Sequence, residues 1–384
     1  METASASSPT KRQEVEEPLE PEEIYKRLGC DNDITHVNRI EWGPFNGSYI
    51  YYDYDDEKIA FLGKTHHGFT DIDNVVALSH ASSFGDLKTK TTVMDESVRK
   101  SFEFDAARLC IGTPSGIKEV TSVVSLRHQL SSVFETVDNI QVVPHKVVTY
   151  REGDFFKCHV DSCEDTTYVG SLIVGLTDGY EGGELKVRHG NVTKSHHVGV
   201  NDTVFFYGNC EHWVEPVTSG VRVVMVCKVL SKEGVTERQM AGSSFNDKVN
   251  AISSNLERRY VHYFQTHHQY AISDWKKMAP KFLKGVDKAF YEQLKKDDTL
   301  EVGLAPGRSS ATFSLESGDC TEELNENEEL FEDDCDCHGS LYYLSDKSKW
   351  TELEGEADYH GHAGNEASHV TQRYIALFFR IFKK

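Results

Sequence analysis

Short apolar runs separated by turn residues dominate the middle of the chain. They are rich in Val, Ile, Tyr and Phe, and Gly, Asn and Asp lie between them; the runs are 145–150, 169–176, 184–188, 203–207 and 221–230. Short strands with turns between them are typical of a β-sandwich or barrel rather than of parallel α/β units. Nearer the N-terminus, an aromatic run at 49–54 and an apolar run at 59–62 flank a charged turn, which predicts a β-hairpin.

Two segments show helical spacing. Thr113 and Pro114 are residue types of an N-cap and a first helical position, and apolar residues follow at spacings of three and four, so a helix is predicted over 114–135. Residues 244–297 also predict helix, with a second half rich in Lys. These lysines form either a solvated face or a docking face for an acidic partner or for the chain's own acidic segment. The apolar run 374–379 predicts a strand that returns to pair with the folded body.

Changes of period and composition divide the chain into parts of an α+β protein. We expect a disordered tail at 1–20, a mixed region with a flanking helix at 21–135, a strand-rich core at 136–232, a helical region at 233–300, an acidic linker at 301–340 and a C-terminal strand region at 341–384. The linker contains eleven acidic residues between 316 and 336, a composition that favours a flexible segment.

Composition and charge limit the classes of partner. The formal net charge is −21, which argues against nucleic acid as the main partner, although acidic proteins without any charged partner are common. The sequence has no run of 18 apolar residues, so we expect no membrane span. The polar start lacks the apolar core of a secretory signal, and nine scattered cysteines do not form a disulfide framework. We therefore expect a cytoplasmic or nuclear protein.

His159, Asp161, His212 and Arg222 carry the candidate chemistry. Alternation along a strand would place His159 and Asp161 on one face, and a later strand could bring His212 beside them. Two imidazoles and a carboxylate on one side of an octahedral metal leave three positions open, as in non-haem Fe(II) oxygenases. A buried Arg222 would bind a carboxylate of a 2-oxo acid through two parallel hydrogen bonds. With 18 His in the chain, about one His-x-Asp is expected by chance, so the combination carries the weight.

Residues 147–229 also resemble a known family. The matching stretches are Tyr150 to Asp161, then Glu181-Gly182-Gly183-Glu184-Leu185, then His212 to Arg222. A Tyr nine residues before the first ligand, a Gly-Gly turn and a Pro-Val before the Arg are each typical of the prolyl 4-hydroxylase-like branch of the 2-oxoglutarate- and Fe(II)-dependent oxygenases.

The resemblance implies a double-stranded β-helix (jelly-roll) core with flanking helices. It implies that His159, Asp161 and His212 bind Fe(II), that Arg222 binds 2-oxoglutarate, and that no other residue is needed as a catalytic group. Tyr150 either donates a hydrogen bond to 2-oxoglutarate or fills the barrel. Ascorbate is a further candidate cofactor. Collagen-type members usually carry Lys where this chain has Arg222, which weakens a collagen assignment.

Three functions stay open from the sequence. The first is hydroxylation of a substrate with O₂ and 2-oxoglutarate, with a prolyl residue of a protein as the best single candidate. The second is oxidation of a small molecule, and the third is a catalytically silent jelly-roll binding module. Cys335, Cys337 and His338, with His360 and His362, suggest zinc only faintly, because the Cys-x-Cys spacing is unusual for it.

Overall fold

The computed structural model describes the greater part of the chain. The described residues are 20–26, 28, 35–40, 42–55, 58–86, 91–120, 126–161, 167–189, 192–237, 243–268, 270, 280–314, 320–321, 340–343, 351–358 and 369–384.

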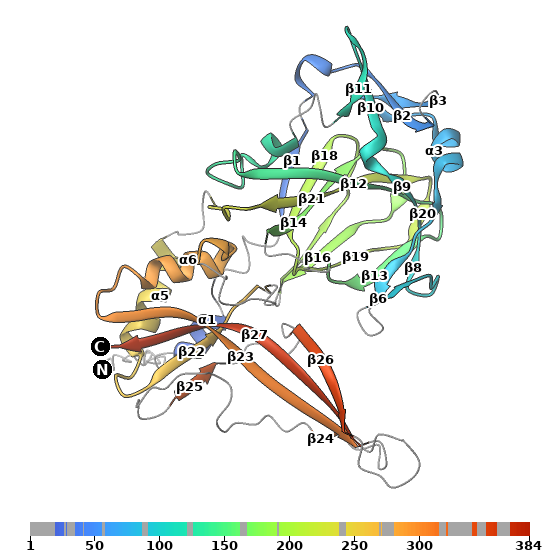
Figure 1. Cartoon of the computed structure of the whole chain (residues 1–384). Helices are drawn as coiled ribbons and strands as arrows, with labels where there is room; N and C mark the ends of the chain where they lie inside the picture. Colours follow the sequence, from blue (N-terminus) through green and yellow to red (C-terminus); the bar gives the residue numbers. More distant parts are fainter. Residues whose placement is uncertain are drawn as a thin grey trace, which may run out of the picture.

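Two antiparallel sheets form a core unit (Figure 1). The first has seven strands in the order β1 (His36–Arg39), β18 (Asp202–Tyr207), β14 (Tyr168–Gly175), β21 (Arg222–Ser231), β12 (Ile140–Tyr150), β9 (Phe102–Asp105) and β5 (His80–Ala81). The second has five in the order β17 (Val192–His196), β16 (Leu185–His189), β19 (Glu211–Val214), β13 (Phe155–His159) and β8 (Arg99–Lys100). Buried residues of both sheets, such as Val174 and Val187, belong to one hydrophobic cluster, so the sheets face each other across a shared core.

The five strands predicted from the apolar runs are confirmed, and four of them are neighbours in the larger sheet. Strand β14 lies between β18 and β21, and all eight of its residues are buried because both faces of the sheet are covered. The core unit is therefore rich in β-sheet and has few helices, which confirms the strand-rich core predicted from the sequence.

The predicted hairpin near the N-terminus is also confirmed. Strands β2 (Tyr49–Asp55) and β3 (Lys58–Lys64) pair antiparallel. They belong to a five-stranded sheet that also contains β10 (Leu109–Thr113), β11 (Gly116–Glu119) and β4 (Gly68–Phe69). The remaining short elements of the core unit are η1 (Gly43–Phe45), α3 (Ile72–Leu78), β6 (Phe84–Asp86), β7 (Thr91–Val93), η2 (Ala106–Arg108), η3 (Leu126–Leu130), β15 (Glu181–Gly182) and β20 (Val217–Ser219).

The helix predicted over 114–135 is wrong at both described ends, because residues 126–130 form the 3-10 helix η3 and residues 131–135 form turns and an isolated β-bridge. Pro114 and Ser115 form the turn between β10 and β11, where the Thr113 hydroxyl donates to the Gly116 carbonyl at 2.6 Å. Gly116 has a φ of +113°, which a helix excludes. Proline fixes φ near −65°, a value that suits a turn as well as a first helical residue, so Thr-Pro alone was ambiguous. Residues 121–125 lie outside the described residues.

A C-terminal unit packs beside the core unit. Its sheet is built on β22 (Val261–Gln265), β23 (Leu300–Ser314), β24 (Cys320–Thr321), β25 (Ser340–Tyr343), β26 (Thr351–Asp358) and β27 (His369–Lys383), and its helices are α5 (Ser243–Asn255), η5 (Pro280–Phe282) and α6 (Gly285–Leu294). Helix α1 (Pro21–Lys26) lies beside α5 although it comes from the other end of the chain (Figure 1). The Tyr25 hydroxyl donates to the Gln265 carbonyl at 2.7 Å, so both chain ends contribute to this unit.

Two expectations for this region need correction. The helical reading of 244–297 is interrupted by β22, five buried residues that pair with β27 and β25. The start of the expected acidic linker is the long strand β23, which pairs with β27 from Leu300 to Ser314. The spacing of apolar residues did not reveal these two strands, because the strands that pair with them lie far away in the sequence. Most of the acidic stretch lies outside the described residues, while the predicted strand at 374–379 is confirmed within β27.

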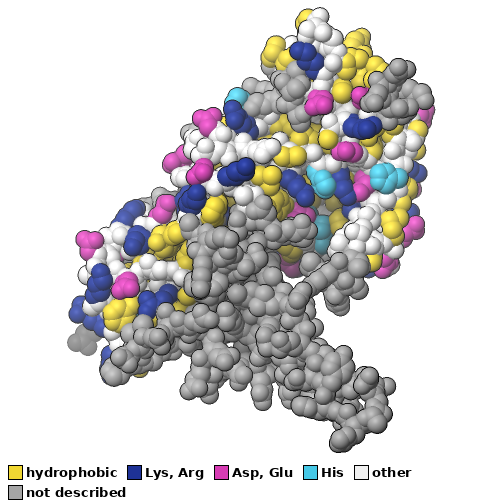
Figure 2. Space-filling view, in the orientation of Figure 1, with side chains coloured by type: hydrophobic (Ala, Val, Ile, Leu, Met, Phe, Trp, Pro, Cys, Tyr) yellow, Lys and Arg dark blue, Asp and Glu magenta, His cyan; other side chains and the backbone are white. Residues whose placement is uncertain are grey.

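The surface and the helices add two observations. On the face shown in Figure 2, acidic and basic side chains of the described residues are interspersed rather than gathered by sign.

Every helix in the described part of the chain is too short or too polar to cross a lipid bilayer.

Candidate metal centre

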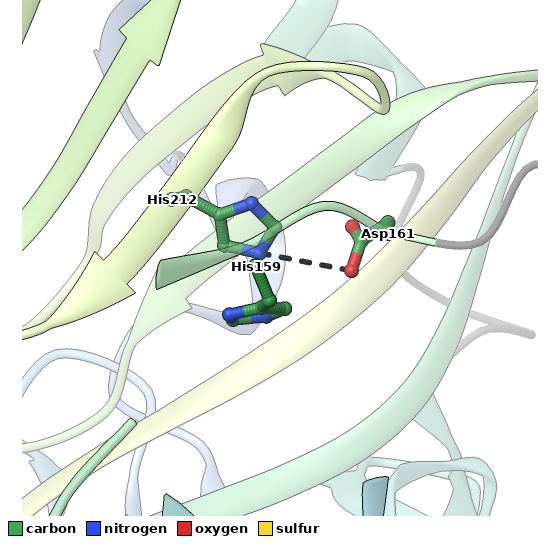
Figure 3. A group of neighbouring side chains, drawn as sticks. All are labelled: His159, Asp161 and His212. Carbon is green, nitrogen blue, oxygen red and sulfur yellow. Dashed lines mark ion pairs between the residues drawn. The ribbon is translucent and has the colours of Figure 1, made fainter. Parts of the chain in front are cut away.

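His159, Asp161 and His212 converge at one point between the two sheets. Their ligand atoms all lie within 4.8 Å of one another (Figure 3). His159 is the last residue of β13 and His212 lies opposite it on β19, as register partners. Asp161 follows the end of β13, so the expected strand alternation between His159 and Asp161 is not what places its carboxylate.

Backbone carbonyls orient both imidazoles. The Nδ1 atom of His159 lies 2.8 Å from the Lys157 carbonyl oxygen, and that of His212 lies 3.0 Å from the Cys210 carbonyl oxygen. A carbonyl can only accept, so each Nδ1 carries a proton, and in a neutral imidazole this leaves the lone pair on Nε2. This is the tautomer that a histidine needs to bind a metal through Nε2.

The Asp161 carboxylate is held by two hydroxyls. Ser171 and Tyr168, both on β14, donate to its Oδ2 atom at 2.7 and 2.9 Å. The other oxygen, Oδ1, lies 3.6 Å from His212 Nε2. Burial raises the pKa of Asp161, but His212 and the two hydroxyl donors outweigh it and hold the pKa below its usual value. The carboxylate is therefore ionised and ready to bind a cation.

The first histidine is packed by an aromatic ring. Phe156 stacks on the His159 imidazole with centroids 3.6 Å apart, and the guanidinium of Arg99, on β8, lies 4.6 Å from the Phe156 centroid. Burial and the neighbouring His212 lower the pKa of His159 to about 3. The imidazole is thus neutral near pH 7, as a metal ligand must be.

Arg222 is the largest buried side chain without a hydrogen-bond partner among the described residues. It is 1% exposed, and none of its three guanidinium nitrogens has a partner there. The strand register shows which way Arg222 points. Arg222 of β21 pairs with Tyr150 of β12, and two residues further along β21, Val224 pairs with Gly175 of β14. Residues an even number of positions apart on one strand lie on the same face of a sheet, so Ser171 shares a face with position 175 and with Arg222. Ser171 is the residue whose hydroxyl donates to Asp161.

The Gly-Gly turn makes room for this guanidinium. Gly183 has a φ of +65°, and a Cβ there would lie 3.1 Å from Arg222 Cδ and 2.8 Å from Val217 Cγ2. Burial raises the pKa of the neighbouring Tyr180, while the positive charge of Arg222 opposes that shift. A buried guanidinium with unused donors is the environment that an anionic ligand would complete.

The other residues singled out from the sequence have plainer surroundings. Tyr150 is buried with its ring 5.1 Å from the Arg222 guanidinium carbon, close enough to line the same space. Trp213 donates to Glu215 at 2.8 Å and has no contact that ties it to chemistry. Cys158 is a free, exposed thiol, and Cys163, Cys335, Cys337, His338, His360 and His362 lie outside the described residues. A cavity of about 630 Å³ beside Leu126 and Ile140 is lined by none of the candidate site residues.

Sequence reasoning missed Tyr168, Ser171 and Phe156. Strand parity would put Tyr168 and Ser171 on opposite faces, but the register of β14 shifts between Tyr168 and Gly170 and brings both to Asp161. The register of β13 likewise shifts between Phe156 and His159, which lets the two rings stack. A β-bulge leaves no dependable mark in a single sequence, so no signal could have identified these residues.

The donor set matches the metal suggested by the sequence. Two imidazoles and one carboxylate whose ligand atoms lie within 4.8 Å of one another are the donor set found in non-haem Fe(II) sites. Arg222 lies on the same face of the larger sheet as Ser171, whose hydroxyl binds the Asp161 carboxylate.

Comparison with solved structures returns prolyl hydroxylases at low overall similarity. A prolyl hydroxylase from Trichoplax adhaerens, solved in complex with a hypoxia inducible factor oxygen degradation domain peptide fragment, is 13% identical over 42% of this chain and 74% of its own, with a TM-score of 0.33. A prolyl-4-hydroxylase from Pseudomonas putida is 14% identical over 42% and 81%, with a TM-score of 0.30. The viral collagen prolyl hydroxylase of Paramecium Bursaria Chlorella virus-1 is 15% identical over 53% and 98%, with a TM-score of 0.29.

Comparison with protein families is more direct. No curated protein matches the chain. Residues 145–228 match the model of the 2OG-Fe(II) oxygenase superfamily, a family that uses Fe(II) and 2-oxoglutarate. The matched segment begins on β12, ends on β21 and contains the three ligand candidates and Arg222. Residues 145–228, which hold all four candidate site residues, are therefore the part of the chain that is similar to the 2OG-Fe(II) oxygenase superfamily.

Proposed function

We propose that this chain is a 2-oxoglutarate- and Fe(II)-dependent dioxygenase that hydroxylates its substrate. One observation carries the proposal: a His-Asp-His ligand set and a buried guanidinium without a hydrogen-bond partner among the described residues lie in the same core between two sheets. A metal site alone would suit many functions. A metal site combined with an unused buried cation suits a metal-bound substrate that carries a carboxylate.

The residues divide the work as follows. His159 Nε2, His212 Nε2 and Asp161 Oδ1 would hold Fe(II), and Arg222 would bind the distal carboxylate of 2-oxoglutarate. Bound together, Fe(II) and 2-oxoglutarate supply an oxidative decarboxylation that yields succinate and CO₂ and delivers one oxygen atom of O₂ to a C–H bond of the substrate. The protein holds the ligands, orients the co-substrate and keeps the space around Arg222 dry.

We further propose that the two facing sheets are a double-stranded β-helix. The antiparallel pairing within both sheets and their shared core support it. For the substrate, we propose a prolyl residue of a protein, on the strength of the motif around Tyr150, the Gly-Gly turn and the Pro-Val before Arg222. A silent binding module is the weaker alternative, because every ligand of the site is present.

Succinate release tests this function. The purified chain with Fe(II), ascorbate and 2-oxoglutarate should release succinate, and prolyl peptides should raise the rate if the substrate proposal is right. His159→Ala should abolish release, because it removes a metal ligand. His80→Ala, an exposed histidine on the edge strand β5, is the matched control and should keep the activity of the unmodified chain. Iron binding without succinate release, or full activity in His159→Ala, would overturn the proposal.

A further inference from the structure

The Oδ2 atom of Asp161 accepts hydrogen bonds from two hydroxyls, and the role that we assign to them rests on the proposed function. We infer that Tyr168 and Ser171 are positioning residues that fix Asp161 as a one-oxygen ligand and so keep the metal's remaining positions open for co-substrates.

The contacts around Asp161 are asymmetric. Ser171 Oγ donates to Oδ2 at 2.7 Å and Tyr168 Oη donates to the same atom at 2.9 Å. The two hydroxyls are themselves 2.9 Å apart, so both stand against one oxygen. Oδ1 instead faces the imidazoles, 3.6 Å from His212 Nε2. Only one of the two oxygens therefore faces the common point of the three ligand candidates.

The asymmetry decides how many positions the carboxylate occupies. Carboxylates bind metals through one oxygen or through both. With two imidazoles and one oxygen, an octahedral metal keeps three positions; with both oxygens it keeps two. A 2-oxo acid that chelates takes two positions, so a two-oxygen Asp161 would leave none for O₂. Two strong donors on Oδ2 compete with the metal for that atom and favour the one-oxygen form.

The fold supplies this pair through an irregularity. The register between β14 and β21 shifts between Tyr168 and Gly170, so residues 168 and 171 reach the same carboxylate despite their odd spacing. Tyr168 is 6% exposed and Ser171 3% exposed, so water does not replace either donor freely.

Cobalt binding tests the inference, with Co²⁺ alone as the probe. We expect Ser171→Ala and Tyr168→Phe each to weaken Co²⁺ affinity about 10- to 100-fold, the usual effect of losing an outer partner of a metal ligand. We also expect the visible absorption of bound Co²⁺ to change, because a carboxylate that binds through both oxygens alters the coordination number. Both readouts are independent of turnover.

The C-terminal unit offers matched controls for both substitutions. Ser253 Oγ donates to Asp297 Oδ2 at 2.6 Å, and Tyr270 Oη donates to Asp287 Oδ2 at 3.0 Å. Ser253→Ala and Tyr270→Phe remove the same kinds of bond in the other unit, and should leave the Co²⁺ affinity and spectrum unchanged. Any general effect of lost stability would appear in these controls as well.

Two outcomes separate this inference from the proposed function. If the unmodified chain releases succinate but Ser171→Ala and Tyr168→Phe, alone and combined, bind Co²⁺ with unchanged affinity and spectrum, the inference is overturned and the function stands. If the unmodified chain binds Co²⁺ and releases no succinate, while the variants still show the weakened affinity and altered spectrum, the function fails and the positioning role stands.

Discussion

Arg222 in the core unit and Asp287 in the C-terminal unit are both buried charges, and their surroundings differ. Asp287 in α6 is fully buried and accepts from the backbone N–H groups of His267 and His268 at 2.7 and 2.8 Å and from the Tyr270 hydroxyl at 3.0 Å. Arg222 in β21 is 1% exposed, yet its guanidinium has no hydrogen bond within the described part of the chain.

We propose that this difference separates a charge that stabilises the fold from one that binds a ligand. A buried charge is costly unless it is hydrogen-bonded. The cost at Asp287 is offset within the protein, so that charge stabilises the fold around it. The cost at Arg222 is not offset by any hydrogen bond within the described residues, and under the proposed function the carboxylate of 2-oxoglutarate would offset it. A buried charge without a hydrogen bond in the described part of the chain can thus indicate a binding site, as a cluster of metal-ligand residues can.

The strongest test of this contrast replaces the unsatisfied charge. We expect Arg222→Met to raise the free energy of unfolding of the ligand-free protein by about 1–3 kcal/mol, since an apolar side chain of similar length removes the desolvation cost. We expect the same variant to weaken 2-oxoglutarate binding about 100-fold or more, because two charge-assisted hydrogen bonds are lost. Urea unfolding and calorimetric titration with 2-oxoglutarate measure the two effects.

Arg222→Lys is the matched control for this prediction. It keeps the charge but loses the parallel pair of donors, so its affinity for 2-oxoglutarate should lie between that of the unmodified chain and that of the Arg222→Met variant. An Arg222→Met protein that unfolds, or one that binds 2-oxoglutarate as tightly as the unmodified chain, would contradict the contrast.

Removal of the hydrogen-bonded Asp287 carboxylate should instead lower the free energy of unfolding. Asp287→Ala leaves three buried donors without their acceptor, and we expect it to lower the free energy of unfolding by about 3–5 kcal/mol. Urea unfolding again provides the measurement. Asp297→Ala is the control: its carboxylate accepts from Ser253 and Thr299 at a less buried turn, so a loss of about 1 kcal/mol is expected. Equal losses in the two variants would show that burial does not distinguish these carboxylates.

Much of the core unit could be predicted from the sequence because its strands carry their own pattern. Apolar runs bounded by turn residues identified β12, β14, β16, β18 and β21, and the order His-x-Asp, His identified the three ligand candidates that the structure brings together. These features are local or depend only on order along the chain. The terminal strand β27 was found for the same reason, since its apolar density is visible without knowing its partners.

The rest depends on distant partners or on small irregularities. Strand β22 is defined by pairing with β25 and β27, residues that lie far along the chain. Pro114 fits both a helix start and a turn, and only Gly116 with its positive φ decides between them. Tyr168 reaches Asp161 through a bulge that changes strand parity. In each case the deciding interaction is tertiary, and a single sequence does not contain it.

The smallest expected effect concerns the junction between the two units. Asn209 Oδ1 lies 2.7 Å from His268 Nδ1, and Asn209 precedes Cys210, whose carbonyl orients His212. We expect Asn209→Ala to lower the free energy of unfolding by about 1 kcal/mol through the lost hydrogen bond, and to change Co²⁺ affinity less than about twofold, because the His212 contact is made by the backbone. Lys281→Ala, which breaks an exposed 3.0 Å pair with Glu233, should cost less than about 0.5 kcal/mol. A large loss of Co²⁺ affinity in Asn209→Ala would instead mean that the C-terminal unit takes part in holding the metal site, and the two regions could no longer be compared as a structural unit and a functional one.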